Sequence, residues 1–130
     1  NDSPVQPRTS PFSRIFPAAI LGLAALGFLV FAIQWLRDPA AMATPLGIVL
    51  TNGDATSDAR AVYGGLELGL ALFLFFCATN PTRRLAGLVA STLVLGGIGV
   101  SRLFGVLVVG RAVTGGTYQL LVTDLVGLVL

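Results

Sequence analysis

The chain contains no histidine and no lysine, and its single cysteine is Cys77. Without histidine, the commonest ligand of haem iron and of transition metals is missing. Without lysine, the chain cannot form a Schiff base with a carbonyl substrate. One cysteine cannot close an internal disulfide, and Cys77 lies in an apolar run, so we interpret it as a small buried hydrophobic residue. We therefore predict no metal site, no cofactor held by a side-chain ligand and no enzymatic activity.

Charged residues are also scarce. The only charged residues among the 130 are eight arginines and six acidic residues, whereas 55% of the residues are hydrophobic. Apolar runs of about 20 residues predict helices that span a membrane. The net charge of +2 comes from arginines that are scattered along the chain rather than gathered in a stripe, which argues against a nucleic acid partner.

Four apolar segments predict an all-α fold, an integral membrane bundle of four transmembrane helices. A polar tail with three prolines, residues 1–14, precedes them, and we expect it to be disordered or extended. The apolar part of the first segment is longer than the core of a signal peptide, so we prefer a membrane helix to that alternative. The last segment is too short to cross about 30 Å of hydrocarbon, and we expect either further residues after it or an end inside a larger assembly. The predicted helices cover residues 16–36, 59–78, 85–109 and 117–130, within one domain at 15–130.

The ends of the first two helices carry further signals. Trp35 ends the first helix, where we expect an aromatic side chain at the membrane interface. Residues 42–50 are moderately apolar and suit a short helix or turn along that interface. Ser57 or Asp58 is expected to cap the second helix.

The arginines also predict the orientation of the helices. Because basic residues favour the cytoplasmic side, the side with more arginines is expected to be cytoplasmic. This places both termini in the cytoplasm. The tail and the second loop carry Arg8, Arg14, Arg83 and Arg84, whereas the first and third loops carry Arg37 and Arg111.

Four ionisable residues fall inside the predicted helices: Arg60, Glu67, Arg102 and Asp124. A charge in hydrocarbon is costly, so such residues pair with one another or face a cavity. Counted from the helix ends, three of them lie about 10 Å deep in one leaflet. We expect Arg102 to bridge Glu67 and Asp124, because a guanidinium can serve two carboxylates. Arg60 stands two turns before Glu67 on nearly the same helix face and is expected to cap this cluster.

Two interpretations of this charge cluster are open. Buried ion pairs often specify an arrangement of helices while adding little stability, and we favour this structural role. The alternative is a site for an anionic head group, a small polar solute or a proton. A carboxylate held beside an arginine stays ionised, which argues against a proton relay and leaves anion or lipid binding as the better functional role.

Small residues at intervals of four allow transmembrane helices to pack closely. Such residues lie beside the charges, and we expect them to serve packing inside the bundle. They are Gly65 and Gly69 on the second helix and Gly97, Ser101 and Gly105 on the third.

Two segments carry a resemblance to a known family. Residues 58–69, DARAVYGGLELG, resemble the most characteristic stretch of a bacterial membrane family known as domain of unknown function 4345. Residues 99–105, GVSRLFG, are similar to its second signature, and Asp124 stands where the resemblance implies a glutamate. The resemblance covers about residues 15–130. It implies a four-helix protein of the bacterial inner membrane and no assigned activity.

These observations favour a non-catalytic structural or accessory subunit of a larger membrane complex, such as a photosynthetic or respiratory assembly. Its partners would be the lipid bilayer and other membrane subunits, and its apolar faces allow contacts with lipid, pigment or quinone. The alternative is a small oligomeric transporter or a lipid- or anion-binding protein that uses the charge cluster. A membrane enzyme is a weaker hypothesis, because only Glu67 and Asp124 are available as an acid or base within the membrane.

Overall fold

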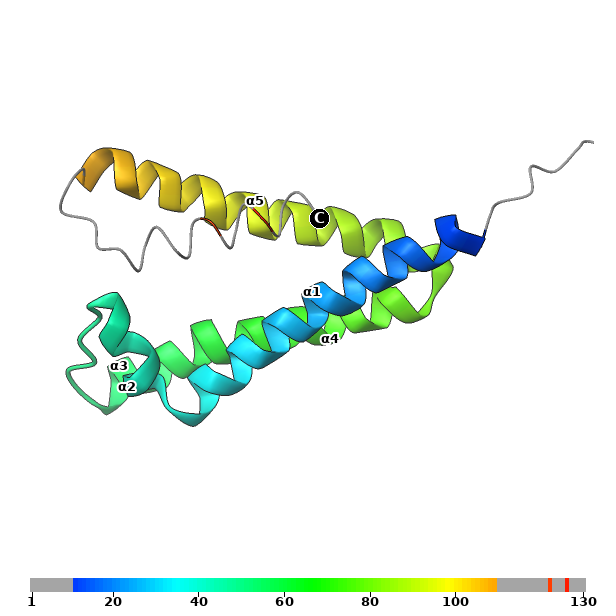
Figure 1. Cartoon of the computed structure of the whole chain (residues 1–130). Coiled ribbons are helices and arrows are strands. Elements are labelled where there is room, and N and C mark those ends of the chain that lie inside the picture. The colour runs from blue at the N-terminus through cyan, green and yellow to red at the C-terminus, as the bar shows by residue number, and fades with distance from the viewer. Residues whose placement is uncertain (1–10, 110–121, 123–125, 127–130) are drawn as a thin grey trace, which may run out of the picture.

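The computed structural model describes residues 11–109, 122 and 126, and the regular structure of these residues is entirely helical (Figure 1). A π-helical turn, η2, joins α3 to α4, so that Gly53–Thr79 forms one continuous helix. In chain order the elements are α1 (Pro11–Arg37), α2 (Pro39–Ala43), the 3₁₀ turn η1 (Thr44–Leu46), α3 (Gly53–Ala59), η2 (Arg60–Gly65), α4 (Leu66–Thr79), the 3₁₀ turn η3 (Pro81–Arg83) and α5 (Arg84–Val109).

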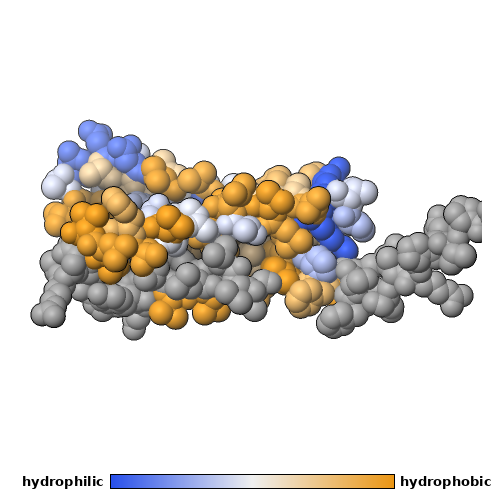
Figure 2. All heavy atoms as spheres, turned by 90° about the horizontal axis from the view of Figure 1, so that it is seen from above, coloured by the Kyte–Doolittle hydropathy of each residue, from blue (hydrophilic) through white to orange (hydrophobic). Residues whose placement is uncertain are grey.

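Three of the described helices are long and apolar enough to cross a membrane: Ile15–Arg37, Gly53–Thr79 and Pro81–Val108. The shortest has 23 residues, or about 35 Å at 1.5 Å per residue, which exceeds the hydrocarbon thickness of a bilayer. Figure 2 shows a broad apolar band with hydrophilic residues gathered at its two ends. Both observations indicate a membrane protein.

The first three predicted helices are confirmed, but two of them begin several residues earlier than predicted. Helix α1 begins at Pro11, so the predicted extended tail is wrong for residues 11–14. Helix α3 begins at Gly53, because Asn52 Oδ1 accepts the Ala55 N–H at 2.8 Å. The predicted caps Ser57 and Asp58 therefore lie inside α3 and do not begin it. The fourth predicted helix lies outside the described residues except for 122 and 126, which are helical.

Helices α1 and α4 run antiparallel along each other and form the central pair of the fold (Figure 1). Their shared core contains Leu21 and Ala25 from α1 and Leu74 and Cys77 from α4. Cys77 is only 1% exposed, as expected for a small buried hydrophobic residue.

Helix α5 approaches this pair at the end where η3 reverses the chain and diverges from it towards the other end (Figure 1). The close approach depends on Gly87, which is buried. A Cβ atom on Gly87 would lie 2.7 Å from Cys77 Cβ and 3.0 Å from Leu21 Cδ2. Only glycine lets the three helices come this close.

We predict that Gly87→Ala lowers the free energy of unfolding by about 1–3 kcal/mol, because Cys77 Cβ is fixed to its helix and the helices must move apart. The matched control is Gly97→Ala in the same helix, where a Cβ would meet no atom within 4 Å. The control should be neutral or slightly stabilising, because alanine is the better helix former. Unfolding in detergent, followed by circular dichroism, measures both. Equal stabilities of the two variants would contradict the packing role of Gly87.

Candidate functional site

An aromatic stack joins the end of α1 to the turn η2. The rings of Trp35 and Tyr63 are stacked, with their centroids 4.5 Å apart and an interplanar angle of 25°. Phe31 meets the same indole edge-on at 6.3 Å. Trp35 is completely buried, and its Nε1 has no hydrogen-bond partner among the residues that the structure describes. The segments after α1 fold over Trp35, and its position at the membrane interface stays a prediction.

These covering segments form a small cap between α1 and α3. Asp38 Oδ1 accepts the Ala41 N–H at 2.9 Å and begins α2. Gly47, at φ +70°, ends η1 and turns the chain back, which is a backbone conformation that favours glycine. Ala43 and Leu50 then pack in the cluster around Trp35. The short helix predicted within residues 42–50 is thus present in part, as the end of α2 followed by η1.

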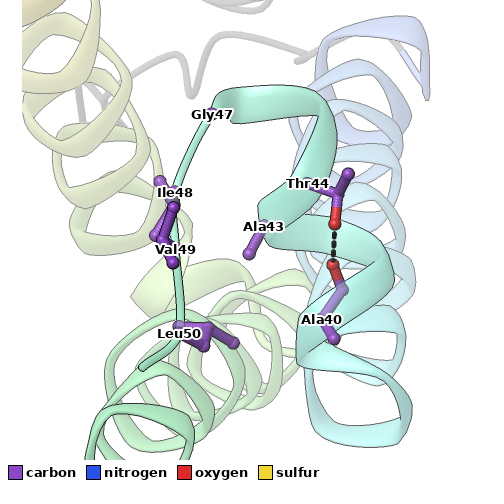
Figure 3. Close-up of a pocket in the computed structure, with 7 residues that line it drawn as sticks. All are labelled: Ala40, Ala43, Thr44, Gly47, Ile48, Val49 and Leu50. Atoms are coloured by element: carbon purple, nitrogen blue, oxygen red, sulfur yellow. Dashed lines mark hydrogen bonds between the residues drawn. The ribbon is translucent and has the colours of Figure 1, made fainter. Parts of the chain in front are cut away.

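The cap borders an open hollow of about 330 Å³ (Figure 3). The turn of α2 and η1 lies on one side of it and the extended segment 48–50 on the other. Thr44 is its only lining residue with a polar side chain, and the hydroxyl donates to the Ala40 carbonyl at 2.8 Å. The lining therefore offers no charged or nucleophilic group for chemistry. It consists of Ala40, Ala43, Thr44, Gly47, Ile48, Val49 and Leu50.

Turn η2 contains a π-helical hydrogen bond, in which the Leu66 N–H donates to the Ala61 carbonyl five residues earlier. Such a turn holds one residue more than an α-helical turn and is often found at functional sites. Gly64 lies within it, against α1. A Cβ on Gly64 would lie 2.7 Å from Leu36 Cγ. The backbone of η2 therefore lies directly against α1 at this position.

Arg60 contacts the C-terminal end of α1. Its Nε donates to the Leu36 carbonyl at 3.3 Å, across 24 residues of sequence. The carbonyls at a helix C-terminus lack intrahelical partners, and a cation is favoured there. Because η2 holds an additional residue, the helical phase between Arg60 and Glu67 differs by about 100° from that of a uniform α-helix. The prediction that Arg60 caps the cluster was based on uniform α-helical spacing, and it stays a prediction.

Glu67 and Arg102 are both half-buried, and both are engaged in interactions. Glu67 Oε2 is screened from solvent at the start of α4. Asp124 lies outside the described residues. The expected bridge from Arg102 to two carboxylates therefore stays a prediction.

The close helix approaches in the described chain occur at Gly64 and Gly87, neither of which belongs to the predicted small-residue set. Within the described ranges, a Cβ on Gly69, Gly97 or Gly105 would meet no atom within 4 Å. The packing role of the predicted set stays a prediction for contacts beyond these ranges. Of that set, Gly65, Gly69, Gly97 and Ser101 are exposed and Gly105 is half-buried.

The comparison with known protein families assigns the chain to one of them. Residues 17–130 match the family described as domain of unknown function, DUF4345. The chain belongs to this family. Neither the search of curated proteins nor the search of solved structures gives a match. The predicted resemblance to this family is thus confirmed, and η2 lies within the matched residues of this DUF4345 protein.

The chemistry available to the DUF4345 protein in its described residues is limited. Across 11–109, no three His, Cys, Asp or Glu side chains lie together in a way that could hold a metal ion. Away from the helix ends, the charged side chains within the described apolar helices are Glu67 and Arg102, with Arg60 nearer one end. This arrangement is suited to ion pairing, helix capping or the binding of an anion.

We predict that Arg60→Met lowers the free energy of unfolding by about 1 kcal/mol, because the variant keeps the apolar stem but leaves the Leu36 carbonyl without its donor. Arg37→Met is the control, since Arg37 is also exposed at this end of α1. Arg37→Met should cost less. A larger loss for Arg37→Met in chemical unfolding would contradict the capping role of Arg60.

A second prediction concerns the charge cluster. Glu67→Leu alone should destabilise the protein by about 1–3 kcal/mol, because Arg102 loses its expected partner. Replacement of Arg60, Glu67, Arg102 and Asp124 together by apolar residues of similar size should be milder, since no charge is then left unpaired. Thermal unfolding in one detergent compares the variants. If the quadruple variant folds normally but loses a binding or transport activity, the structural interpretation is wrong.

Proposed function

We propose that this protein is a non-catalytic accessory subunit of a larger complex in the bacterial inner membrane, with both termini in the cytoplasm. The observation that carries the proposal is the exposed face of α5. Gly97 and Ser101 are exposed one helical turn apart on this face, and no described atom would meet a Cβ on Gly97 within 4 Å.

Small residues matter more in a membrane than in water. Lipid chains are as apolar as leucine, so burying leucine against another helix gains little, whereas a strip of small residues allows two backbones to pack closely. In this chain the strip is flanked by large exposed residues that would surround a docked helix. Leu93 is 70% exposed and Val100 is 69% exposed. This combination supports a transmembrane helix of a partner subunit as the occupant.

The path of α5 supports the same proposal. The helix is anchored to α1 and α4 through Gly87, near its first residue, and then diverges from them (Figure 1). The small residues Gly97 and Ser101 belong to the diverging part. A helix that leaves its own pair in this way presents its faces to neighbours.

A non-catalytic role is consistent with the residue types. The chain has neither histidine nor lysine, and Cys77 is buried. A photosynthetic or respiratory assembly is our suggested host, because its pigments or quinones can contact apolar helix faces without a side-chain ligand. Such contacts would supply the cofactor chemistry from the host and not from this subunit.

A small oligomeric transporter, or a lipid- or anion-binding protein, is the second candidate. It is favoured by the half-buried Glu67 and Arg102, which lie within apolar helices. Intramembrane charges of this kind often mark a pathway or a binding site. The chain is small for alternating access, so this function would require several copies.

Native gel electrophoresis of solubilised source membranes, with mass spectrometry of the band, tests the two candidates. The accessory-subunit proposal predicts migration with a large assembly of other proteins. Migration as a small oligomer of this chain alone would contradict it and favour the charge cluster as a binding site.

The face on α5 is tested by Gly97→Leu. The variant should fold normally, because the position is open, yet leave the large assembly. The matched control is Gly27→Leu on α1, which is also exposed and would meet no atom within 4 Å. If both variants stay in the assembly, this face of α5 is not the interface.

A further inference from the structure

The cap between the first two spanning helices carries large apolar side chains that belong to neither helix. Leu46, Ile48 and Val49, which we call the cap tip, are all exposed, and Val49 is 79% exposed. Exposed apolar residues of a spanning helix are explained by the lipid alongside it. The cap tip lies instead in η1 and in the extended segment that follows. Exposed apolar residues that lie close together often mark a surface that contacts a membrane or another protein.

The cap is held beside the ends of the spanning helices. Only Asp38 separates α1 from α2. Ala43 and Leu50 of the cap pack in one cluster with Trp35 and Ala59. Trp35 belongs to the first spanning helix and Ala59 to the second. The apolar surface that the two helices present to lipid therefore continues onto the cap at this end.

The hollow of the cap is suited to an apolar chain. Among its described lining residues, the one polar side chain is that of Thr44, and this hydroxyl already donates to the Ala40 carbonyl. A polar head group would find no charged side chain and no free hydroxyl donor in this lining, whereas an acyl chain would gain dispersion contacts and leave water. Ile48 and Val49 belong both to the lining and to the cap tip, so the hollow and the tip form one surface (Figure 3).

We propose that the cap lies in the interfacial layer of the membrane and that its tip and hollow bind the acyl chain of a bilayer phospholipid. Interfacial elements bury their apolar face about 5–10 Å into the boundary between head groups and acyl chains. The two ends of the cap suit this depth, because Asp38 and Asn52 place polar side chains there and accept backbone N–H groups. The proposal goes beyond the accessory-subunit function and does not depend on it.

Spin labelling of the cap tip tests this placement. Val49→Cys supplies an exposed cysteine, whereas the native Cys77 is buried, so the unchanged chain serves as the labelling control. The full chain is reconstituted in phosphatidylcholine vesicles. Electron paramagnetic resonance then measures collisions of the label with oxygen, which concentrates in the membrane, and with a nickel chelate, which stays in water. The label at position 49 should collide more with oxygen. Asp54→Cys is the matched control, exposed in the first turn of α3, and should collide more with the nickel chelate.

A second measurement tests the hollow itself. Trp35 is the only tryptophan of the chain, and it packs against Ala43 and Leu50, which line the hollow. Phosphatidylcholine that is brominated in the upper part of its acyl chain quenches tryptophan fluorescence at short range. Ala40→Phe should fill the hollow and lower this quenching. Ala41→Phe, at an exposed neighbouring position outside the lining, should leave it unchanged.

Circular dichroism checks that each variant is folded. If Ala40→Phe loses helix content, Ala40→Val replaces it, and the quenching should change in the same direction. Three results would overturn the proposal. Collisions with the nickel chelate that dominate at position 49 as at position 54 would place the cap tip in water. Few collisions with either reagent at position 49 would show that protein covers the tip, either another part of this chain or a second copy. Equal quenching in both phenylalanine variants and in the unchanged chain would show that no acyl chain occupies the hollow.

Discussion

The contact between the last turn of α1 and the π-helical turn η2 determines how the described helices are placed. Three different interactions meet there. Tyr63 stacks on Trp35, Gly64 brings its backbone against Leu36, and Arg60 donates to the carbonyl of Leu36. Each depends on the others, because the stack and the hydrogen bond both require the close approach that Gly64 permits. The additional residue in η2 then sets the direction in which α4 presents its side chains.

The positions of the first three helices could be predicted from the sequence because the signals are local. Apolar runs of sufficient length have few alternatives in a membrane, where backbone groups must be satisfied within the segment. Helix starts were predicted less well. Asn52 begins α3 where Ser57 and Asp58 were expected, because several consecutive residues are good caps and the chain can use only one. Which residue begins the helix depends on how the segments between α1 and α3 pack over Trp35. The local sequence does not determine this packing.

In the candidate site, too, the features set by local sequence could be predicted and those set by packing could not. Glu67 and Arg102 were recognised from their chemistry alone, since a charge in an apolar run is unusual whatever its surroundings. The role of Arg60 was not predictable, because it depends on the helical phase between residues 60 and 67. Helical phase was assumed to be uniform, and a π-helical turn has no reliable sequence signal beyond the neighbouring glycines 64 and 65. The glycine contacts were missed for a related reason. Regular spacing in the sequence identifies a possible strip of small residues. Gly64 and Gly87 are important instead because of the side chains that they face on neighbouring helices.

The two ends of the molecule differ in how they satisfy their polar groups. At the end with the cap, Asp38 and Asn52 bind backbone N–H groups and Arg60 binds a backbone carbonyl, so that end is largely satisfied within the chain. At the other end, Asn80 Oδ1 accepts hydrogen bonds from the Thr82 N–H and hydroxyl, and the guanidinium of Arg83 lies over the Phe76 ring. Among the described residues, Asp38, Asp54 and Asp58 lie at the capped end, whereas the turn between α4 and α5 carries Arg83 and Arg84. The membrane surface is the surrounding that both ends share, and the asymmetry therefore gives the chain a reason to prefer one orientation in it.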